Sequence, residues 1–373
     1  PQGIALAILC PYDCDNSAIS LSLTNRTVLL ELCAGRVDSG CGHCWWGHCR
    51  IDFGSRSGLL RYGYCCYRSP NGGGSSLKVQ LSDGNCARVV QFLPADLGTK
   101  AVYYGAEHQV LMAALQGAIA ATRNVHYLCS STVSEIHDRG DCVVAEVSTP
   151  EGMLRVRSPL FVAADGKGSP LRQQAGIGSV GWRYRQSCVT TVLEPEHSHQ
   201  NTAYERFWPS GPFAILPLPG NRCQIVWTAP HAEAEAILSL PETEFMAELE
   251  RRYGTQMGRL RRLTPPALFP VQLMQCDRYV QSRLALVGDA AHSCHPVGGQ
   301  GLNMGIRDAA ALAEVLIQAY QQNQDLGSIA VLRRYERWRR TENWVILSFT
   351  DLLTRTFSNQ IWPIVVLRRA GLW

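Results

Sequence analysis

The stretch that most constrains the fold of this chain is residues 284–308, LALVGDAAHSCHPVGGQGLNMGIRD. An apolar run ends at Gly288-Asp289, a glycine-rich loop follows, and a helical pattern begins at about Leu302. Ligands of open α/β sheets bind at the carboxyl ends of the strands. The pattern therefore predicts a buried strand that places a buried acid, Asp289, where it can accept hydrogen bonds from sugar or polyol hydroxyl groups.

The glycines after Pro296 predict a backbone that a flat ligand can approach, because glycine has no Cβ to obstruct it. The helix that follows directs its N-terminus, which carries about half a positive charge, at the same place and favours negative charge on the ligand. A plain strand–turn–helix with glycine turns is the alternative, and the combination with Gly-Asp and Asn303 argues against it. The candidate site consists of Gly288, Asp289, Ala290, Pro296, Gly298, Gly299, Gln300, Gly301, Leu302 and Asn303.

The rest of the chain alternates between α/β and antiparallel patterns. Continuous apolar runs at 160–164 and 283–287 predict strands buried on both faces. Between them, residues 187–228 alternate as antiparallel sheet does, with a hairpin at Pro219-Gly220-Asn221. Helical spacing occupies 107–119, 242–253, 303–320 and 329–357. We therefore expect an α/β nucleotide-binding core that is interrupted by a second, β-sheet domain.

Charge and cysteine usage exclude several classes of protein. The net charge of +4 over 373 residues argues against a dedicated nucleic-acid binder. No apolar run reaches the roughly 18–20 residues that a membrane-spanning helix needs, and no signal peptide is visible. Eight of the fifteen cysteines lie in residues 1–66 and the others are scattered, which favours a reduced, cytoplasmic setting over a disulfide scaffold.

The motif VGDAAHSCHPVGGQGLNMGIRDA resembles the second flavin motif of the class A flavoprotein monooxygenases, the p-hydroxybenzoate hydroxylase type. It is most similar to their ubiquinone-biosynthesis branch, the polyprenylphenol hydroxylases. The resemblance implies that Asp289 binds the ribityl chain of FAD and that Pro296–Asn303 lies against the isoalloxazine ring. A helix N-terminus at the ring would favour the anionic reduced flavin.

Three further segments carry the resemblance. FVAADGKGS (161–169) is similar to the family's Asp-Gly motif, which implies that Asp165 and Gly166 lie near the FAD pyrophosphate and the path of NAD(P)H. AEHQVLMAAL (106–115) resembles a helix that approaches FAD, with Gln109 as a candidate contact. ERFWPSGPFAILPLPGNRCQIVW (205–227) resembles the sheet that covers the flavin ring.

The resemblance implies a hydroxylase that uses FAD, NAD(P)H and O2 on a small aromatic substrate. NAD(P)H reduces the flavin, O2 adds at C4a to give a hydroperoxide, and its distal oxygen passes to an electron-rich phenol ring. Since the flavin carries this chemistry, we expect no catalytic side chain and no metal, and we do not interpret His292 and His295 as metal ligands. The alternatives are another flavin oxidoreductase, related to halogenases or geranylgeranyl reductases, and a non-catalytic homologue unable to hold FAD.

Residues 1–76 do not match the family, which opens with a strand, a G-x-G-x-x-G loop and a helix. A zinc site at Cys41, Cys44, His48 and Cys49 is one interpretation, and a divergent lobe is another. We favour a third, that the segment is not in its evolved reading frame. Residues 59–70, shifted by one base, can encode Gly-Ile-Ala-Ala-Ile-Ala-Pro, which is similar to a helical stretch of the family. We therefore predict a glycine-rich βαβ unit in another frame upstream of about codon 77, and weak or absent FAD binding by the chain as it stands.

The expected architecture is a three-layer, Rossmann-like FAD-binding core with an inserted antiparallel β-sheet substrate domain, a C-terminal helical tail and an N-terminal βαβ unit that is missing or garbled. Arginine pairs and tryptophans in the tail indicate either a solvated helix with its tryptophans in the core or a membrane-surface face that admits a polyprenyl substrate. A multi-enzyme quinone-synthesis complex is a further expected partner. The expected segments are 1–76 (non-matching), 77–172 and 279–325 (FAD-binding), 173–278 (substrate-binding) and 326–373 (helical tail).

Overall fold

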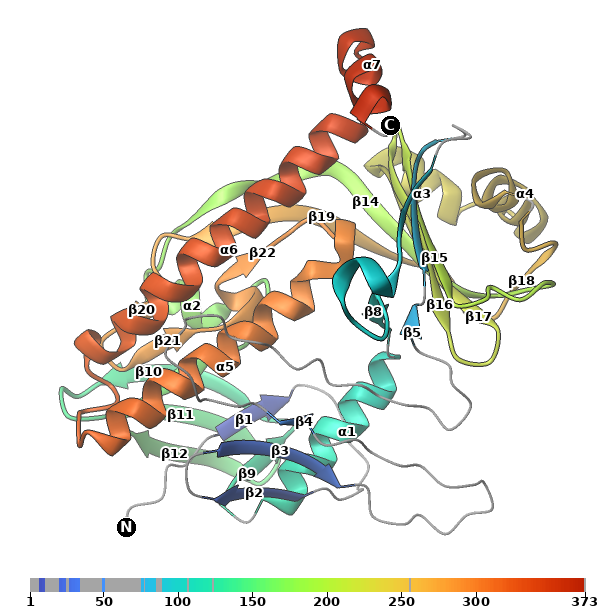
Figure 1. Cartoon of the computed structure of the whole chain (residues 1–373). Helices are drawn as coiled ribbons and strands as arrows, with labels where there is room; N and C mark the ends of the chain where they lie inside the picture. The colour runs from blue at the N-terminus through green and yellow to red at the C-terminus, as the bar shows by residue number, and fades with distance from the viewer. Residues whose placement is uncertain are drawn as a thin grey trace, which may run out of the picture.

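A computed structural model describes residues 78–371, apart from 85–88, 106, 123 and 255 (Figure 1). Before residue 78 it describes five short strands: β1 (Ala7–Cys10), β2 (Ser20–Thr24), β3 (Thr27–Cys33), β4 (Cys49–Arg50) and β5 (Ser75–Ser76). Most of the proposed zinc site (Cys41, Cys44 and His48) and the shifted-frame stretch 59–70 lie outside the described residues, as does Trp373.

Two parallel strand pairs form the centre of the α/β part. β13 (Phe161–Ala163) pairs with β21 (Leu284–Leu286), whose three residues are all buried, and β20 (Val280–Gln281) adds to β21 in the antiparallel direction. The two apolar runs predicted as strands are therefore confirmed. β1 pairs in parallel with β9 (His126–Cys129), so one strand of the non-matching N-terminal segment does join this part of the fold.

Three antiparallel strands and four helices surround these pairs. The strands are β10 (Thr132–Asp138), β11 (Val143–Thr149) and β12 (Gly152–Ser158). The helices are α1 (His108–Ala121), α2 (Pro170–Gln174), α5 (Gln300–Gln321) and α6 (Ile329–Phe357). α5 and α6 run side by side along the α/β part, and α6 reaches toward the upper sheet (Figure 1).

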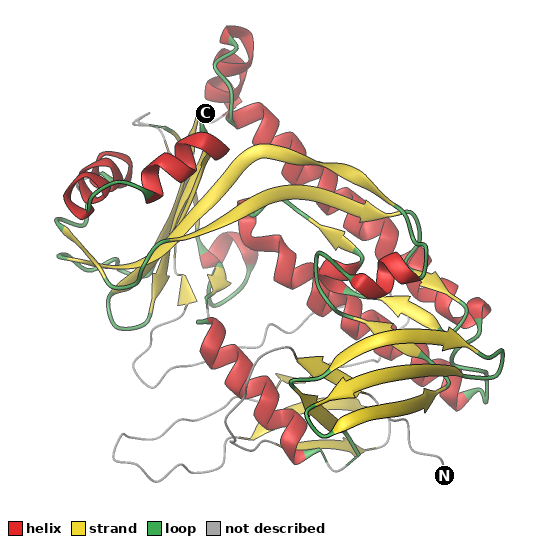
Figure 2. Cartoon of the chain, turned by 180° about the vertical axis from the view of Figure 1, so that it is seen from behind, coloured by secondary structure: helices red, strands yellow, loops and turns green. Residues whose placement is uncertain are grey.

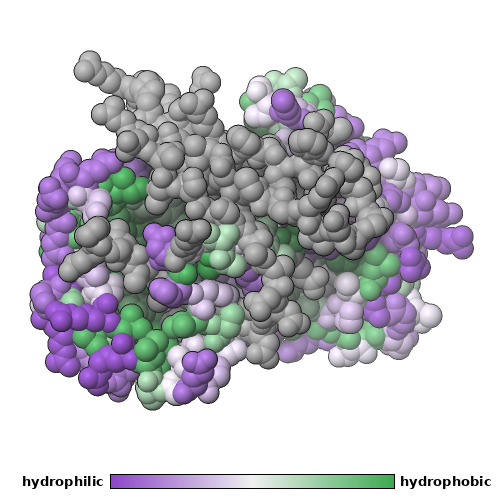
Figure 3. Space-filling view, turned by 90° about the horizontal axis from the view of Figure 1, so that it is seen from below, coloured by the Kyte–Doolittle hydropathy of each residue, from purple (hydrophilic) through white to green (hydrophobic). Residues whose placement is uncertain are grey.

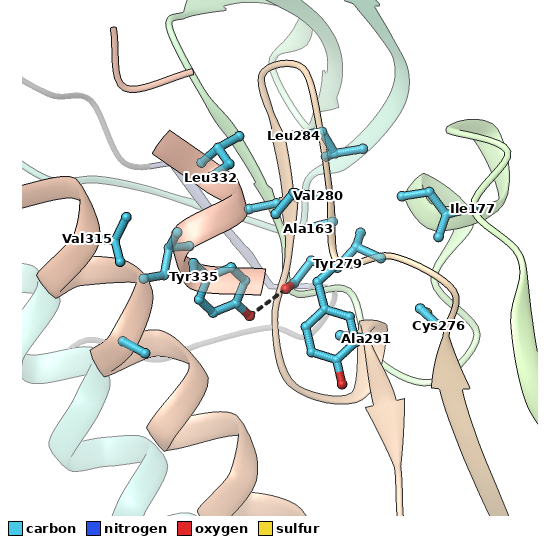
Figure 4. Packing of buried hydrophobic residues seen from close by; sticks show 14 of the residues in the cluster. Ala163, Ile177, Cys276, Tyr279, Val280, Leu284, Ala291, Val315, Leu332 and Tyr335 are labelled. Atoms are coloured by element: carbon cyan, nitrogen blue, oxygen red, sulfur yellow. Dashed lines mark hydrogen bonds between the residues drawn. The ribbon is translucent and has the colours of Figure 1, made fainter. Parts of the chain in front are cut away.

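The core of the α/β part lies between its strands and α5 and α6. Figure 4 shows Tyr335 of α6 beside Tyr279, Val280 and Ala163 in this cluster. The buried Tyr335 hydroxyl donates a hydrogen bond of 2.8 Å to the backbone oxygen of Leu286 at the end of β21. A satisfied hydroxyl in an apolar core fixes the position of its partner, so α6 holds the strand that leads into the glycine-rich loop.

A nine-stranded sheet forms the second part. Its order is β22-β19-β14-β17-β16-β15-β6-β7, with β18 paired to β14, and all pairs are antiparallel except β6 with β15. The hairpin predicted at 219–221 joins β16 to β17, with Leu218 opposite Arg222. The strands are β6 (Lys78–Asp83), β7 (Val89–Phe92), β14 (Ser179–Pro195), β15 (Thr202–Trp208), β16 (Gly211–Leu218), β17 (Arg222–Pro230), β18 (Leu260–Arg262), β19 (Ala267–Cys276) and β22 (His292–Ser293).

The two faces of the large sheet have different neighbours. Phe213, Trp227 and Val189 lie on the outer face in a core with α3 (His231–Leu238) and α4 (Glu242–Tyr253). On the inner face, Phe207 packs against Phe357 at the end of α6, with ring centroids 4.4 Å apart. The view from behind shows the long strands β14 and β19 curving over the helices of the α/β part (Figure 2). The inner face of the sheet is therefore turned toward these helices.

The large sheet also contains strands from the two segments that flank the expected substrate-binding segment 173–278. β6 and β7 belong to the expected segment 77–172, and β22 belongs to 279–325. The domain boundaries stay a prediction, but strand pairing does not stop at them.

Two 3-10 helices, Gly288–Ala290 and Val297–Gly299, lie in the segment between β21 and α5. The remaining described elements are peripheral: the 3-10 helix Pro94–Leu97, the strand β8 (Tyr103–Tyr104), which pairs with β5, and the C-terminal helix α7 (Trp362–Gly371). Within the described ranges, no helix has the length and apolar character needed to cross a membrane. Seen from below, the described surface carries many hydrophilic residues at its edges, with hydrophobic residues between them (Figure 3).

Candidate functional site

The loop between β21 and α5 has the open backbone that its sequence predicts. Gly288, Gly298 and Gly299 have positive φ angles of 58°, 73° and 61°, which side-chain-bearing residues rarely adopt. A Cβ added at Gly298 or Gly299 would meet no atom within 4 Å. The loop therefore ends in two glycines whose backbone is open to a ligand, directly before the first turn of α5 at Gln300.

The side chains of the candidate site divide into exposed and buried groups. Asp289 is exposed at the strand tip, so the expectation of a buried acid at this position was wrong. Leu302 is 62% exposed, although leucine is usually buried. The amides of Gln300 and Asn303 donate to the backbone oxygens of Gly298 and Gly299, at 3.0 and 3.2 Å. The exposed members are Asp289, Pro296, Gly298, Gly299, Leu302 and Asn303; Gly288, Gln300 and Gly301 are partly buried, and Ala290 is buried.

The buried acid of this region is Asp308 on α5, which the sequence analysis did not identify. Its carboxylate is fully buried and accepts hydrogen bonds from the backbone N–H of Gly288 at 3.0 Å and from His292 Nε2 at 2.5 Å. Arg339 Nε and Asn343 Nδ2, both on α6, donate to its other oxygen at 2.8 and 3.0 Å. Asp308 therefore holds the glycine-rich loop, α5 and α6 together.

The charge of Asp308 is stabilised in spite of its burial. Burial alone would raise the pKa of this carboxyl, but the hydrogen bonds from His292, Arg339 and Asn343 outweigh that effect and lower the pKa. The sequence contains a pattern that identifies this residue. Asp308 shares one helix face with buried Met304, Ala311 and Leu312, and an acid on an apolar face requires partners.

A second residue that the sequence analysis missed is Gly305. A Cβ on Gly305 would lie 3.4 Å from the Cα of Gly288, which is closer than most side chains tolerate. Small residues at both positions therefore let α5 pack directly against the strand tip.

The Asp165-Gly166 loop lies against the glycine-rich loop. Asp165 accepts hydrogen bonds from Ser169 Oγ at 2.6 Å and from the backbone N–H of Leu171 at 3.1 Å, so its carboxylate shapes the start of α2. The buried Arg172 then donates to the backbone oxygen of Ala290 at 2.9 Å. Two motifs far apart in the sequence are brought together by this arginine. The predicted contact Gln109 lies in the first turn of α1, and its side chain is outside the described residues.

Lys167 connects both loops to the large sheet. Its ammonium group donates to the backbone oxygen of Pro270 on β19 at 3.2 Å. Burial lowers the pKa of Lys167, and the negative charge of Asp289 acts in the opposite direction. Asp289, Lys167 and β19 therefore border the same region between the two parts of the molecule.

His295 is buried within this region and has one unsatisfied nitrogen. Its Nδ1 accepts a hydrogen bond from the backbone N–H of Val297 at 3.2 Å, which places the proton of the neutral ring on Nε2. Within the described part of the chain, Nε2 has no partner. The ring meets the edge of Tyr184 on β14 at 5.1 Å, and burial lowers the pKa of His295 to about 4. His295 is therefore neutral at physiological pH.

These residues fit a flavin dinucleotide. An exposed carboxylate, a backbone without Cβ atoms and a helix N-terminus suit a polyol chain, a flat ring and developing negative charge, respectively. No cluster of three metal-ligating side chains occurs in the described ranges, and the His292 ring is bound to Asp308.

Comparison with known proteins gives matches over most of the chain. Residues 105–350 match the FAD binding domain family. The chain is 47% identical over 300 residues to an uncharacterized Synechocystis protein, covering 79% of this chain and 71% of that protein. It is 39% identical over 296 residues to ubiquinone hydroxylase UbiL of Rhodospirillum rubrum (79% and 68% covered). It is 34% identical over 283 residues to the 3-demethoxyubiquinol 3-hydroxylase of Escherichia coli (76% and 71% covered).

Solved structures give the same fold at lower identity. The p-nitrophenol 4-monooxygenase PnpA of Pseudomonas putida is similar with a TM-score of 0.65 at 22% identity, covering 80% of this chain and 75% of that one. Klebsiella pneumoniae HpxO, solved with FAD and uric acid, has a TM-score of 0.61 at 18% identity, covering 80% and 77%. At these identities the likeness concerns the fold.

Proposed function

The chain belongs to the class A FAD-dependent aromatic monooxygenases, in their ubiquinone-biosynthesis branch, and we propose that it hydroxylates a polyprenylphenol or a related quinone-precursor ring. The names of two relatives, a ubiquinone hydroxylase and a demethoxyubiquinol hydroxylase, support this substrate class. The observation that carries the proposal is the exposed Asp289 beside the open Gly298-Gly299 backbone at the start of α5.

The proposed role of each part of the loop follows from its geometry. Asp289 would accept hydrogen bonds from the ribityl hydroxyls of FAD, and the backbone of 296–303 would lie along the isoalloxazine ring. The N-terminus of α5 would stabilise negative charge on the reduced ring. When bound, FAD would supply electron transfer from NAD(P)H and the activation of O2 for transfer to the phenol.

The Asp165 loop is the proposed border of the FAD pyrophosphate and of the path of NAD(P)H. In the structure the Asp165 carboxylate is bound to Ser169 and Leu171, so it would act by shaping the loop. Gly166, with a φ of 81° and no atom within 4 Å of an added Cβ, would be the point of close backbone approach.

FAD binding and oxygen transfer test the function separately. We expect visible flavin absorbance after reconstitution to be weak for the chain as it stands and to increase when a glycine-rich N-terminal unit is restored. Asp289→Ala should abolish the absorbance, and Glu314→Ala, at a partly buried position of α5 more than two turns from the loop, should not. A restored protein that stays colourless would favour the non-catalytic homologue.

The reaction itself is tested with a simple prenylated phenol such as 2-prenylphenol, NADH or NADPH, and isotopically labelled O2. We expect one labelled oxygen in the product, detected by mass spectrometry. Flavin reduction and substrate turnover without labelled oxygen would indicate the alternative, another flavin oxidoreductase.

We also propose that the outer face of α6 and α7 contacts a membrane surface while the rest of the protein lies in the cytoplasm. Trp344, Leu352 and Trp362 are 62%, 62% and 76% exposed, so these tryptophans are not core residues. Exposed Arg333 and Arg337 lie on α6 before them. Arginines beside exposed tryptophans suit a surface of anionic lipid. Assembly into a multi-enzyme quinone-synthesis complex stays a prediction.

A variant that tests this contact must leave Arg368 of α7 unchanged. Arg368 is buried and paired with Asp83 at 2.9 Å, so replacing it would disturb folding as well as binding. A Trp344→Ser and Leu352→Ser double variant keeps the buried face of α6 intact. We expect it to sediment less with anionic liposomes than the wild type, and equal sedimentation would remove the proposal.

A further inference from the structure

Glu205 occupies the middle of the inner face of the large sheet. It lies on β15, opposite Leu81 of β6 on one side and Ala214 of β16 on the other. The same row continues through Val226 on β17 to Thr190 on β14. Side chains opposite one another in a sheet point to the same face, and the alternate row packs with α3 and α4. Glu205 therefore points away from that core and toward the α/β part.

Within the described part of the chain, the carboxyl group of Glu205 is unpaired. Among the residues that the structure describes, none forms a hydrogen bond or an ion pair with it, although buried carboxylates normally have both. The residue keeps part of its surface accessible, as do Thr190 and Val226 in the same row. Desolvation by the surrounding protein nevertheless raises the pKa of Glu205 to about 7. Glu205 is therefore a partly buried, desolvated carboxyl group on the face of the sheet that is turned toward the α/β part.

Interactions across the inner face of the sheet link Glu205 to the candidate flavin loops. Burial raises the pKa of Cys188 on β14 to about 11; the charge of Glu205 adds to that effect and the charge of Lys167 opposes it. Lys167 in turn lies within the electrostatic influence of Asp289 and contacts β19. Glu205, Cys188 and Lys167 therefore lie within electrostatic range of one another, and Lys167 joins this group to the glycine-rich loop and to β19.

We propose that Glu205 accepts a hydrogen bond from the phenolic hydroxyl of the aromatic substrate and takes its proton during hydroxylation. This inference rests on the proposed function. In the step, the phenol O–H bond breaks and the proton passes to the carboxylate. The electron pair stays on the phenol oxygen and enriches the ring carbon that receives oxygen from the flavin, and the proton later returns to water.

Among the residues paired with Glu205 across the sheet, and Cys188 and Lys167, no other group can take this role. Leu81 and Ala214 have no titratable group, and the Cys188 thiol stays protonated at neutral pH. Lys167 acts on Cys188 as a cation and is not an acceptor. A carboxylate that titrates near neutrality is well suited to general base catalysis at physiological pH.

The first test is the pH dependence of 2-prenylphenol hydroxylation by the reconstituted enzyme. We expect the wild-type kcat to increase as the pH rises through about 7. Glu205→Gln should lower kcat at alkaline pH by about 10²-fold and remove that increase, and Glu205→Asp should restore it. Glu194→Gln, at a partly buried position of the same sheet where the carboxylate is paired with Arg261, is the control. Flavin absorbance should be the same in all four proteins, and wild-type kcat and pH dependence in Glu205→Gln would overturn the proposal.

The second test does not depend on hydroxylation. 4-Nitrophenol changes colour on ionisation, so the pKa of the bound probe can be measured in the wild type and in Glu205→Gln. A nearby carboxylate opposes a second negative charge, so we expect the bound probe to ionise at lower pH in the variant. Identical titration in both proteins, or no saturable binding by the wild type, would overturn the proposal. The pKa of the bound probe could also differ between the two proteins while the wild type forms no hydroxylated product. That result would disprove the proposed function but would keep Glu205 as the acceptor of a phenolic hydroxyl group.

Discussion

The glycine-rich loop and the inner face of the large sheet hold their candidate residues in different ways along the chain. The loop carries its candidate residues within 288–303, on one continuous stretch of backbone. The sheet brings Leu81, Glu205, Ala214 and Thr190 into one row from four separate strands. A local motif can therefore be recognised directly in the sequence, whereas a row across a sheet becomes visible only when the register is known.

The largest expected effect is on the loop side, at Asp308. Asp308→Ala would remove the buried carboxylate partner of Arg339, which would keep only Glu342 and Asn343, and would leave the N–H of Gly288 without its acceptor. Removing one partner of a buried pair costs about 3–5 kcal/mol. We expect a loss of this size in the free energy of unfolding from urea titration, and a change below about 0.5 kcal/mol for the control Glu314→Gln on the same helix. Equal changes in the two variants would show that Asp308 does not hold the loop.

Prediction from sequence succeeded where the pattern is local. The buried strands, the hairpin at 219–221 and helices α4 and α6 were found from periodicity and turn residues, because each is determined by its own segment. Asp308 was missed because its partners lie on α6, and the exposure of Asp289 was not predicted because it depends on how the loop leaves β21. Glu205 was part of a recognised segment, but its lack of a partner follows from packing across strands that are distant in the chain.

Desolvation favours the neutral forms of His295 and Glu205, so the stability contributions of these two residues should depend on pH in opposite directions. On the loop side, the pKa of His295 is lowered from 6.5 to about 4. The unfolded chain then binds a proton at mildly acidic pH while the folded chain does not. We expect stability to be complete above about 6.5 and to decrease as the pH falls toward 4, by up to about 3 kcal/mol. His295→Gln should flatten this part of the profile, and an unchanged acid slope in the variant would contradict the burial of the ring.

On the sheet side the sign is reversed. The pKa of Glu205 is raised from 4.5 to about 7, so the folded state favours the protonated form. Its contribution is complete below about 4.5 and is lost as the pH rises through about 7. Glu205→Gln should therefore be more stable than the wild type at alkaline pH, by at most about 3 kcal/mol, and similar to it at acid pH. Urea titrations of cofactor-free protein at the two pH values measure this difference, and equal stability at alkaline pH would place Glu205 in solvent.

The smallest expected effects on stability concern two glycines, Gly298 and Gly301. Glycine can be needed at such a position either for a left-handed backbone or for the close approach of a ligand. Gly298 has a φ of 73°, whereas Gly301 lies in the first turn of α5 with only Cys294 Sγ near an added Cβ, at 3.9 Å. Gly298→Ala should lower the free energy of unfolding by about 1–2 kcal/mol because alanine disfavours a left-handed backbone. Gly301→Ala should leave it unchanged or raise it by up to about 1 kcal/mol because alanine favours a helix. If both glycines also serve close approach to the flavin ring, both variants should bind FAD more weakly than the wild type in a fluorescence titration. If Gly301→Ala binds FAD more weakly without losing stability, the absence of a side chain at this position serves FAD binding. If this variant binds FAD as tightly as the wild type, the close contact with the flavin is limited to the turn before the helix.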